Sequence, residues 1–299
     1  MKYGYIGLGN LGGHLAASLA QAGFDLTVHD KSPALAERHL ALGAKWADSP
    51  KQLAEQVDVV LTCLPSPAVS DLVLEELIAA GKQGLHWLEM STLGRDEIQA
   101  LAKQANAAGI QVLESPVTGG VHLAAQGKIT VIVGGEQALF DQHKPAFEAM
   151  GDKIFYIGAL GSAAIIKVIT NMLAFIHLVA DGEALMLAKR GGLDLAQAWA
   201  VIKASSGNSF VHETEGQLIL NGSYDIAFTM DLALKDLGFA LNFGREFEVP
   251  LDLASMTQQT FVKGKAAYGG QAQSTQIVKL LEDVLQTDLR AEGFPSRLE

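Results

Sequence analysis

The chain has 299 residues, enough for about two domains of ordinary size. Hydrophobic residues make up 49% and charged residues 18%, and the formal net charge is −11, from 22 Lys and Arg against 33 Asp and Glu. Such an acidic chain suits neither nucleic acid nor an anionic membrane surface, so we expect no nucleic acid and no membrane partner. The single cysteine, Cys63, excludes an intrachain disulfide framework and a cysteine-rich zinc site, and we expect no metal.

The N-terminal residues predict a dinucleotide site. A strand over Tyr3 to Gly7 runs into the sequence GLGNLG and then a helix over His14 to Ala22. The three glycines match GxGxxG: the first permits a tight turn, the second lets the backbone approach a pyrophosphate, and the third lets the helix pack on the strand. The helix N-terminus offers N–H groups to the phosphates. The predicted cofactor-binding residues of this turn are Gly7, Gly9, Asn10, Leu11 and Gly12.

The second predicted strand, Asp25 to Asp30, ends in an acid 18 residues after Gly12. A carboxylate there accepts hydrogen bonds from the adenosine ribose and repels a 2′-phosphate, so Asp30 favours NAD over NADP. Lys31 partly offsets that repulsion and keeps NADP as the alternative. Asp30 is otherwise interpreted as a turn acid before Ser32 and Pro33. Because a strand pattern starts at once, with no signal-like segment, we also expect a cytoplasmic protein.

Two further strands are expected to end near the cofactor, because ligands bind beyond the carboxyl ends of parallel strands. Val57 to Leu64 is followed by Pro65, and Leu85 to Met90 is followed by Ser91 and Thr92. Leu64, Pro65 and Thr92 are therefore candidate cofactor contacts. The hydroxyls of Ser91 and Thr92 touch the nicotinamide ribose, cap a helix that starts near Gly94, or do both. Cys63 is interpreted as a small buried residue, not a nucleophile.

A strand from Ile110 to Glu114 leads into SPVTGG, a short helical stretch, and a strand over Gly127 to Gly135. The turn at Thr118, Gly119 and Gly120 resembles a backbone nest, with N–H groups that suit a small carboxylate. His122 points at the same anion or is simply an exposed helix residue. A final strand, Lys153 to Ile157, closes this part of the chain.

Gly158 to Arg190 predicts a long apolar helix, GALGSAAIIKVITNMLAFIHLVADGEALMLAKR, with Lys167 and Asn171 near its start. Spaced by four residues, they lie about 40° apart around the helix axis and so share one face. They are either a catalytic pair or a lysine that reaches solvent beside a satisfied buried amide. The five polar residues Lys167, Asn171, His177, Asp181 and Glu183 interrupt the run too often for an ordinary membrane span, and a helix apolar around most of its circumference is expected to be buried.

Helical segments follow around Leu195 to Ala204, Phe210 to Leu220, Asp231 to Glu246, Leu251 to Ala267 and Thr275 to Gln286, separated in one place by Ser205 to Ser209. The sequence thus predicts an α/β dinucleotide-binding domain over 1–160, of the doubly wound Rossmann type, and an all-helical domain over 161–299. Lys235 in LALKDLGFA either reaches the active site or pairs with Asp231 along the helix.

These blocks together resemble the β-hydroxyacid dehydrogenases, the family of 3-hydroxyisobutyrate dehydrogenase, tartronate semialdehyde reductase and, more distantly, 6-phosphogluconate dehydrogenase. GLGNLGGHLA looks like its cofactor fingerprint, ESPVTGGVHLAAQGKITVIVGG its substrate motif, GALGSAAIIKVITN its catalytic motif and MDLALKDLGFA its late lysine motif. Leu11, Thr118, Ala163 and Thr170 depart from the commoner residues. The resemblance implies a homodimer or homotetramer, with Lys167 as catalytic lysine and Asn171 as substrate-orienting asparagine.

The expected activity is hydride transfer between NAD and a small 3-hydroxy acid or its semialdehyde. Lys167 takes or returns the hydroxyl proton, and its ordinary pKa of about 10.4 has to be depressed by the apolar helix around it. Asn171 orients the hydroxyl, while Ser115 and Thr118 to Gly120 hold the carboxylate and Lys235 borders the nicotinamide. The alternatives are an NADP-dependent reductase of a semialdehyde, glyoxylate or imine, and a non-catalytic dinucleotide-binding regulator. Specificity is expected to depend on His122, Asn208, Phe210, His212 and Lys263.

Overall fold

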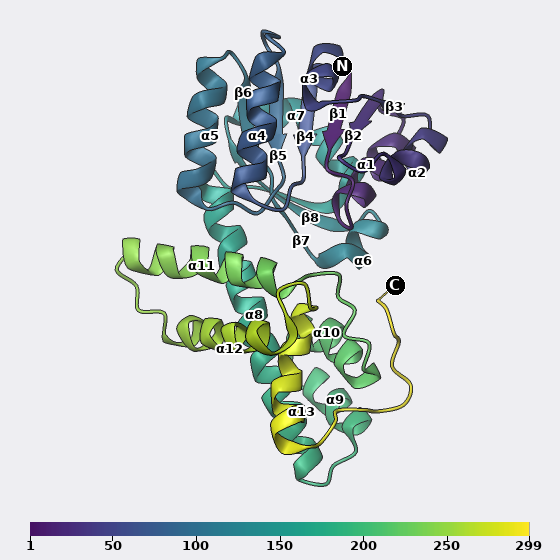
Figure 1. Cartoon of the computed structure of the whole chain (residues 1–299), viewed down its shortest axis with the longest axis vertical. Coiled ribbons are helices and arrows are strands. Elements are labelled where there is room, and N and C mark those ends of the chain that lie inside the picture. The colour runs from purple at the N-terminus through teal and green to yellow at the C-terminus, as the bar shows by residue number, and fades with distance from the viewer. Residues whose placement is uncertain (299) are drawn as a thin grey trace. The chain divides into compact units, whose positions relative to one another are not determined.

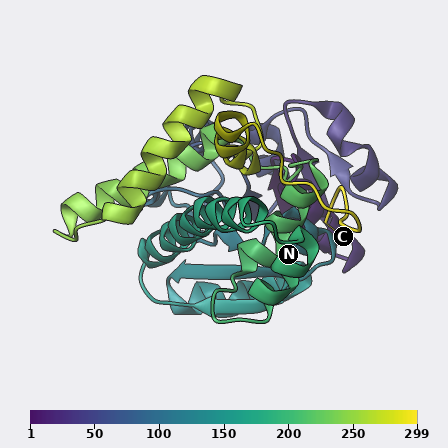
Figure 2. The same cartoon turned by 90° about the horizontal axis from the view of Figure 1, so that it is seen from below.

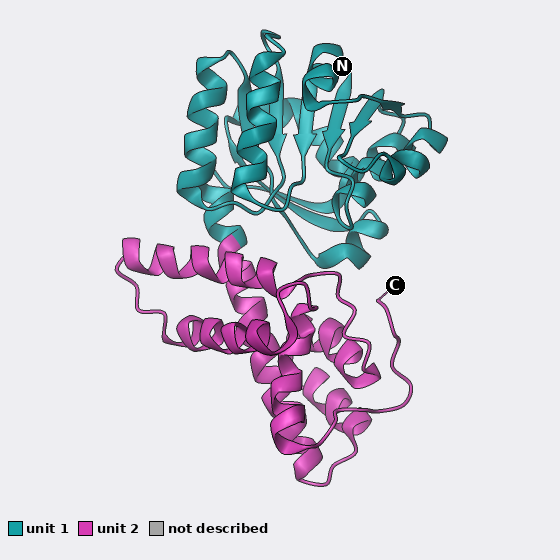
Figure 3. Ribbon diagram, viewed as in Figure 1, with its two compact units in different colours: residues 1–167 teal, residues 168–299 magenta. Residues whose placement is uncertain are grey.

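The computed structural model describes residues 1–298, and the chain divides into two compact units, Met1–Lys167 and Val168–Glu299 (Figure 3). The division falls inside the long helix α8 (Ser162–Arg190). The predicted domain boundary after residue 160 lies just before this helix and stays a prediction.

The first unit is a mixed sheet covered by helices. Over residues 1–298 the sheet has nine strands: β1 (Tyr3–Ile6), β2 (Leu26–His29), β3 (Lys45–Trp46), β4 (Val59–Thr62), β5 (His86–Glu89), β6 (Gln111–Glu114), β7 (Val117–Thr118), β8 (Ile129–Gly135) and β9 (Gly151–Tyr156). Its helices are α1 (Gly12–Gln21), η1 (Pro33–Ala36), α2 (Glu37–Ala41), α3 (Pro50–Gln56), α4 (Pro67–Ala79), α5 (Arg95–Ala107), α6 (Gly120–Ala125) and α7 (Gln137–Met150). The predicted strands agree with these bounds to within two residues.

The strand order indicates where a ligand would bind. The strands β3, β2, β1, β4, β5 and β6 lie side by side in that order and all parallel, and β8 then pairs antiparallel with β6 (Figure 1). This is the order of a doubly wound dinucleotide-binding sheet, so the predicted α/β class is confirmed. In this topology the binding crevice lies beyond the carboxyl ends of β1 and β4, where the chain changes direction across the sheet.

Helices cover both faces of the sheet, which explains why β1, β2 and β4 are buried along their whole length. One core cluster joins the sheet to α1 and α7 through Leu15, Leu19 and Phe147. The other joins it to α3 and α4 through Leu53 and Leu74. These two layers fix the strand ends, and with them the turns that follow.

The second unit is helical. After α8 it contains α9 (Leu195–Lys203), α10 (Phe210–Asn221), α11 (Met230–Glu246), α12 (Asp252–Tyr268), η2 (Ser274–Val278) and α13 (Lys279–Leu285). The helices α11 and α12 run side by side, as Figures 1 and 2 show. Ser209 caps α10 as the predicted break requires, whereas the predicted last helix divides into η2 and α13.

One face of α8 differs from the expectation of a buried helix. Ile169, Leu173 and Leu187 are 37%, 43% and 76% exposed, and their spacing puts them on one stripe that also contains exposed His177, Ala180 and Ala184. By length and composition α8 is long and apolar enough to cross a membrane, a test that the core helices of soluble proteins also pass. The polar residues along it argue against such a span.

A histidine pair near the amino ends of the strands makes stability depend on pH. His143 is fully buried, with Nε2 2.8 Å from His86 Nδ1 and Nδ1 3.3 Å from the Tyr3 hydroxyl. Burial, together with the neighbouring His86, lowers the pKa of His143 to about 4. An unfolded histidine titrates near 6.5, so stability is full above that pH and falls by roughly 1.4 kcal/mol per pH unit as pH drops toward 4.

Urea unfolding of the parent and of His143→Gln across this pH range measures the effect. The parent is expected to lose stability more steeply than the variant below about pH 6.5, because only the parent must protonate a buried imidazole. Parallel curves for the two proteins would contradict this prediction.

Candidate active site

The turn after β1 fits a dinucleotide phosphate group. Gly7 has φ +98°, and a Cβ there would lie 2.3 Å from the Cys63 carbonyl oxygen. A Cβ on Gly12 would lie 2.1 Å from the Gly7 carbonyl oxygen, so α1 packs against the turn only with glycine at that position. Gly9 and Asn10 are exposed, and nothing lies within 4 Å of a Cβ on Gly9. The turn therefore leaves open space where the backbone would approach a pyrophosphate.

Asp30, the acid after β2, is tied to this turn. One oxygen of its half-buried carboxylate accepts the Leu8 N–H at 2.7 Å, and the other accepts the Ser32 N–H at 2.8 Å. The second contact is that of a turn acid, while the first holds the carboxylate beside the glycine turn. The contact with Ser32 matches the interpretation of Asp30 as a turn acid, and its role toward the adenosine ribose stays a prediction.

The ends of β4 and β5 are joined by Ser91, whose hydroxyl accepts the Leu64 N–H at 2.7 Å. Pro65 is exposed, and Thr92 is half-buried. Helix α5 begins at Arg95 with Gly94 as its N-cap and no side-chain cap hydrogen bond. Gly94 therefore stands at the N-cap position, and the Ser91 hydroxyl is used between the strands.

The predicted carboxylate turn has an unusual backbone. Gly119 and Gly120 have φ +122° and +84°, conformations that favour glycine, and they lead from β7 into α6. Thr118 and Gly119 are half-buried, and Gly120 is exposed. The ring of His122 lies back over Gly120, 3.2 Å from where a Cβ would stand. Ser115 differs from its neighbours: it is fully buried, and its hydroxyl donates to the Glu89 carbonyl at 3.5 Å.

Lys167 lies close to the end of β4. It is only 7% exposed. Burial raises the pKa of the Cys63 thiol to about 12 and the Glu89 carboxylate adds to the rise, while the Lys167 ammonium opposes it. Cys63 also lies against the glycine turn, because its carbonyl oxygen would be 2.3 Å from a Cβ on Gly7. Such a high pKa keeps the thiol neutral, in agreement with a packing role for Cys63.

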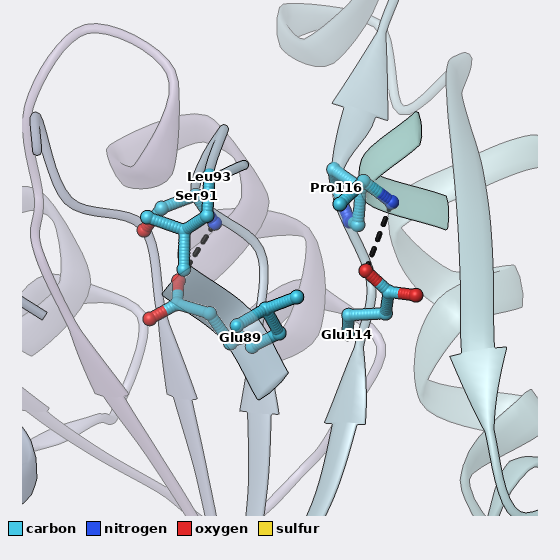
Figure 4. A pocket seen from close by; sticks show the side chains of 7 residues that line it. Glu89, Ser91, Leu93, Glu114 and Pro116 are labelled. Carbon is cyan, nitrogen blue, oxygen red and sulfur yellow. Dashed lines mark hydrogen bonds between the residues drawn. The ribbon is translucent and has the colours of Figure 1, made fainter. Parts of the chain in front are cut away.

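Two buried glutamates near these strand ends were missed by the sequence reasoning. Glu89 and Glu114 occupy paired positions at the ends of β5 and β6 and line one small pocket with Ser91, Leu93 and Pro116 (Figure 4). Glu89 is 1% exposed and accepts the Ser91 N–H at 2.7 Å, and burial raises its pKa. The carboxylate of Glu114 accepts backbone N–H groups at the start of α8. The sequence did contain a sign of these two residues, because each of these buried strands ends in an acidic residue.

In the second unit Asn171 and Lys235 share a buried acid, Asp236. Its Oδ2 accepts the Asn171 Nδ2–H at 2.6 Å, and its Oδ1 lies 2.9 Å from Lys235 Nζ. Asp236 is 1% exposed. Lys235 thus has an ion pair with the adjacent Asp236, while Asp231 pairs with Lys265 at 2.6 Å. Asp236 was not singled out from the sequence, although it directly follows Lys235 in KDLG.

His212, one of the residues expected to shape specificity, lies inside the helical unit. Its Nδ1 is 2.5 Å from Asp181 Oδ1 and its Nε2 is 2.9 Å from the Trp199 carbonyl oxygen, and the side chain is 1% exposed. Carboxylate and carbonyl oxygens both accept, so this environment favours the charged imidazolium, in which both ring nitrogens donate. Desolvation opposes this state, but the hydrogen bond to Asp181 prevails and the pKa of His212 is raised. His212 is thus engaged internally.

A doubly wound sheet with a glycine turn at its switch point is the architecture of a dinucleotide-binding protein. The family model for the NAD binding domain of 6-phosphogluconate dehydrogenase matches residues 2–158. A second family model, for the NAD-binding domain of NADP-dependent 3-hydroxyisobutyrate dehydrogenase, matches residues 161–281. The chain belongs to the β-hydroxyacid dehydrogenase family, as its motifs indicated. It is an oxidoreductase that transfers a hydride between NAD(P) and a small hydroxy acid.

Three related proteins illustrate the similarity. The 2-(hydroxymethyl)glutarate dehydrogenase of Eubacterium barkeri is 30% identical over 288 residues, covering 95% of this chain and 96% of the relative. A crystal structure of 3-hydroxyisobutyrate dehydrogenase from Salmonella typhimurium is 30% identical, with a TM-score of 0.88 over 94% of this chain and 99% of that one. The Mycobacterium tuberculosis 3-hydroxyisobutyrate dehydrogenase with L-serine is 26% identical, with a TM-score of 0.83 over 94% and 98%.

Proposed function

We propose that this enzyme oxidises a small 3-hydroxy acid to its semialdehyde with NAD, and catalyses the reverse reduction, using Lys167 as the proton-transferring group. The observation that carries the proposal is the environment of Lys167. Its side chain is nearly buried, and its charge opposes the rise in the pKa of Cys63, whose carbonyl oxygen lies against Gly7. A lysine there sits beside the strand ends where the nicotinamide nucleotide is expected. When bound, that cofactor supplies the hydride acceptor or donor.

Side chains and backbone N–H groups of the protein transfer the proton, orient the substrate and bind its carboxylate. In oxidation the Lys167 amine accepts the hydroxyl proton, and in reduction the ammonium returns it. Asn171 is one helical turn further along α8 and orients the hydroxyl, with its amide held by Asp236. The N–H groups of Thr118, Gly119 and Gly120 receive the substrate carboxylate. Ser115, which is buried, supports the path of β6 into this turn, and Lys235 adds positive charge beside Asn171.

The substrate class follows from chemistry that the relatives share. L-serine, 3-hydroxyisobutyrate and 2-(hydroxymethyl)glutarate each carry a hydroxymethyl group on the carbon that bears the carboxylate. A carboxylate turn and a proton-transferring lysine match those two groups. The test is an absorbance screen for reduced nicotinamide over small 3-hydroxy acids and, in reverse, their semialdehydes, glyoxylate and a cyclic imine. Turnover of the imine alone would overturn the proposal, as would cofactor binding with no turnover of any substrate.

NAD is proposed as the preferred cofactor because Asp30 lies at the glycine turn. Asp30→Ser removes the carboxylate that repels a 2′-phosphate, while Lys31 stays in place. The ratio of kcat/KM for NAD to that for NADP is expected to fall at least tenfold, mainly through KM for NAD. Steady-state kinetics with each cofactor measure it, and Lys45→Ser, which removes an exposed ion pair with Asp25, is the control. An unchanged ratio would rule out this role of Asp30.

The oligomer is also a proposal. The apolar stripe Ile169, Leu173 and Leu187 on α8 is exposed in a single chain, and burying such a stripe against a second copy would remove it from water. We expect a homodimer or homotetramer by sedimentation velocity, and Leu173→Glu would shift it toward monomer. We also propose that the enzyme is soluble and lies in the cytoplasm, which fits its bacterial relatives.

A further inference from the structure

We propose that Glu114 is a positioning residue of the reaction, which holds the first turn of α8 and thereby sets the place of Lys167. This inference rests on the proposed role of Lys167. It concerns the last residue of β6, which acts through the start of another element.

The contacts are those of a buried helix cap supplied from a distant strand. Glu114 Oε1 accepts the N–H groups of Gly161 at 2.5 Å and Ala163 at 2.9 Å, and Oε2 accepts that of Ala164 at 2.8 Å. The side chain is 2% exposed. The first N–H groups of a helix have no partner within the helix, and a carboxylate is the strongest acceptor for them. Glu114 thus satisfies three N–H donors at the start of α8 and lies at the positive end of its dipole.

Helix geometry connects this cap to Lys167. Lys167 follows Ala163 by four residues and Ala164 by three, so all three lie on neighbouring parts of one face. Helical Cα–Cβ bonds lean toward the N-terminus, so the Lys167 side chain starts out toward the turn that Glu114 holds. A shift of that turn displaces the backbone from which the Lys167 side chain starts.

The structure makes room for this carboxylate at the expense of a side chain on β8. Gly134 is paired with Glu114 across the antiparallel β6–β8 ladder. A Cβ on Gly134 would lie 2.4 Å from Glu114 Oε1 and 3.1 Å from the Ala159 carbonyl oxygen. Gly134 therefore offers a second way to displace the carboxylate while Glu114 itself remains in the chain.

The charge of Glu114 should also affect the pH dependence of the reaction, which a packing role alone would not do. Burial raises its pKa, and the N–H groups of Ala163, Ala164 and Gly161 work in the opposite direction. A carboxylate over the first turn favours the ammonium form of a nearby lysine. Without it, the acid limb of the pH profile of kcat for oxidation is expected to move to lower pH, which simple loss of folded protein would not cause.

The test compares Glu114→Gln, Glu114→Ala and Gly134→Ala with Asp194→Ala, which removes the acidic N-cap of α9 that accepts the Gln197 N–H. Each variant is assayed for kcat, KM, NADH affinity by fluorescence, and the pH profile of oxidation, per folded molecule. We expect Glu114→Ala and Gly134→Ala to lower kcat at least tenfold with NADH affinity within threefold of the parent. Glu114→Gln should lose less kcat but shift the acid limb by about half a pH unit or more, and Asp194→Ala should change neither quantity.

Two results would overturn the inference. One is a parental kcat and acid limb in folded Glu114→Gln and Gly134→Ala; the other is an equal change in Asp194→Ala. Lys167→Ala separates this failure from that of the proposed function. If Lys167→Ala is inactive while the Glu114 variants are normal, only the positioning role is wrong. If Lys167→Ala keeps nearly full activity, the proposed function itself is wrong.

Discussion

Lys167→Ala is expected to lower kcat about 10²- to 10⁴-fold, the range of a lost general acid–base group. The lysine is 7% exposed, and its charge opposes the rise in the pKa of Cys63. It is not part of the glycine turn, so its removal should leave that turn intact. NADH affinity is therefore expected to stay within a few-fold of the parent. Stopped-flow or steady-state oxidation of the best 3-hydroxy acid, with NADH binding by fluorescence, measures both quantities.

Two companion variants sharpen the test. Lys167→Arg keeps a positive charge but cannot lose its proton near neutral pH, so it should be nearly as inactive as the alanine variant. A small primary amine added to Lys167→Ala should restore part of the rate, increasingly as pH rises. Lys189→Ala, at the other end of α8, is the control and should retain parental kcat. Turnover of Lys167→Ala within tenfold of the parent would show that another group transfers the proton.

The first unit was largely predictable because its signals are local. Strands such as Val59–Thr62 are buried on both faces and therefore read as continuous apolar runs, and the glycine turn has the same backbone requirement wherever it occurs. The two-residue strands Lys45–Trp46 and Val117–Thr118 were not predicted, since two residues carry no periodicity. The expectation that α8 is buried was wrong for one stripe, because Ile169, Leu173 and Leu187 are exposed although their composition is that of a core.

A residue of the candidate site could be proposed from the sequence where it belongs to a local motif, but not where its contacts come from a distant part of the chain. The residues next to them in the sequence are enough to identify Gly7, Gly12 and Lys167 as candidates. Glu114 depends on N–H groups at Gly161 and beyond, contacts that no spacing in the sequence encodes. Asp236 likewise acquires its role only when α11 is packed against α8 in the helical unit.

Asp236→Ala is expected to lower kcat/KM about 10²-fold, the largest effect we predict in the helical unit. The carboxylate orients the Asn171 amide at 2.6 Å and lies 2.9 Å from Lys235 Nζ. Its loss leaves the amide free to rotate and removes the counter-charge of the lysine, so substrate orientation suffers while the cofactor turn in the other unit is untouched. Kinetics with the best hydroxy acid, together with NADH affinity, test this distribution of effects.

A double-mutant cycle identifies the route by which Asp236 acts. If Asp236 works by holding the amide, Asn171→Ala with Asp236→Ala should be little worse than the more damaging single variant, with a coupling of about 0.5–3 kcal/mol. Asp236→Asn fills the same volume without a charge and should fall between parent and alanine variant. The control is Asp231→Ala, since Asp231 lies on the same helix but pairs with Lys265. Fully additive losses from Asn171→Ala and Asp236→Ala would mean that the two residues act independently, and the buried acid would then serve Lys235 alone.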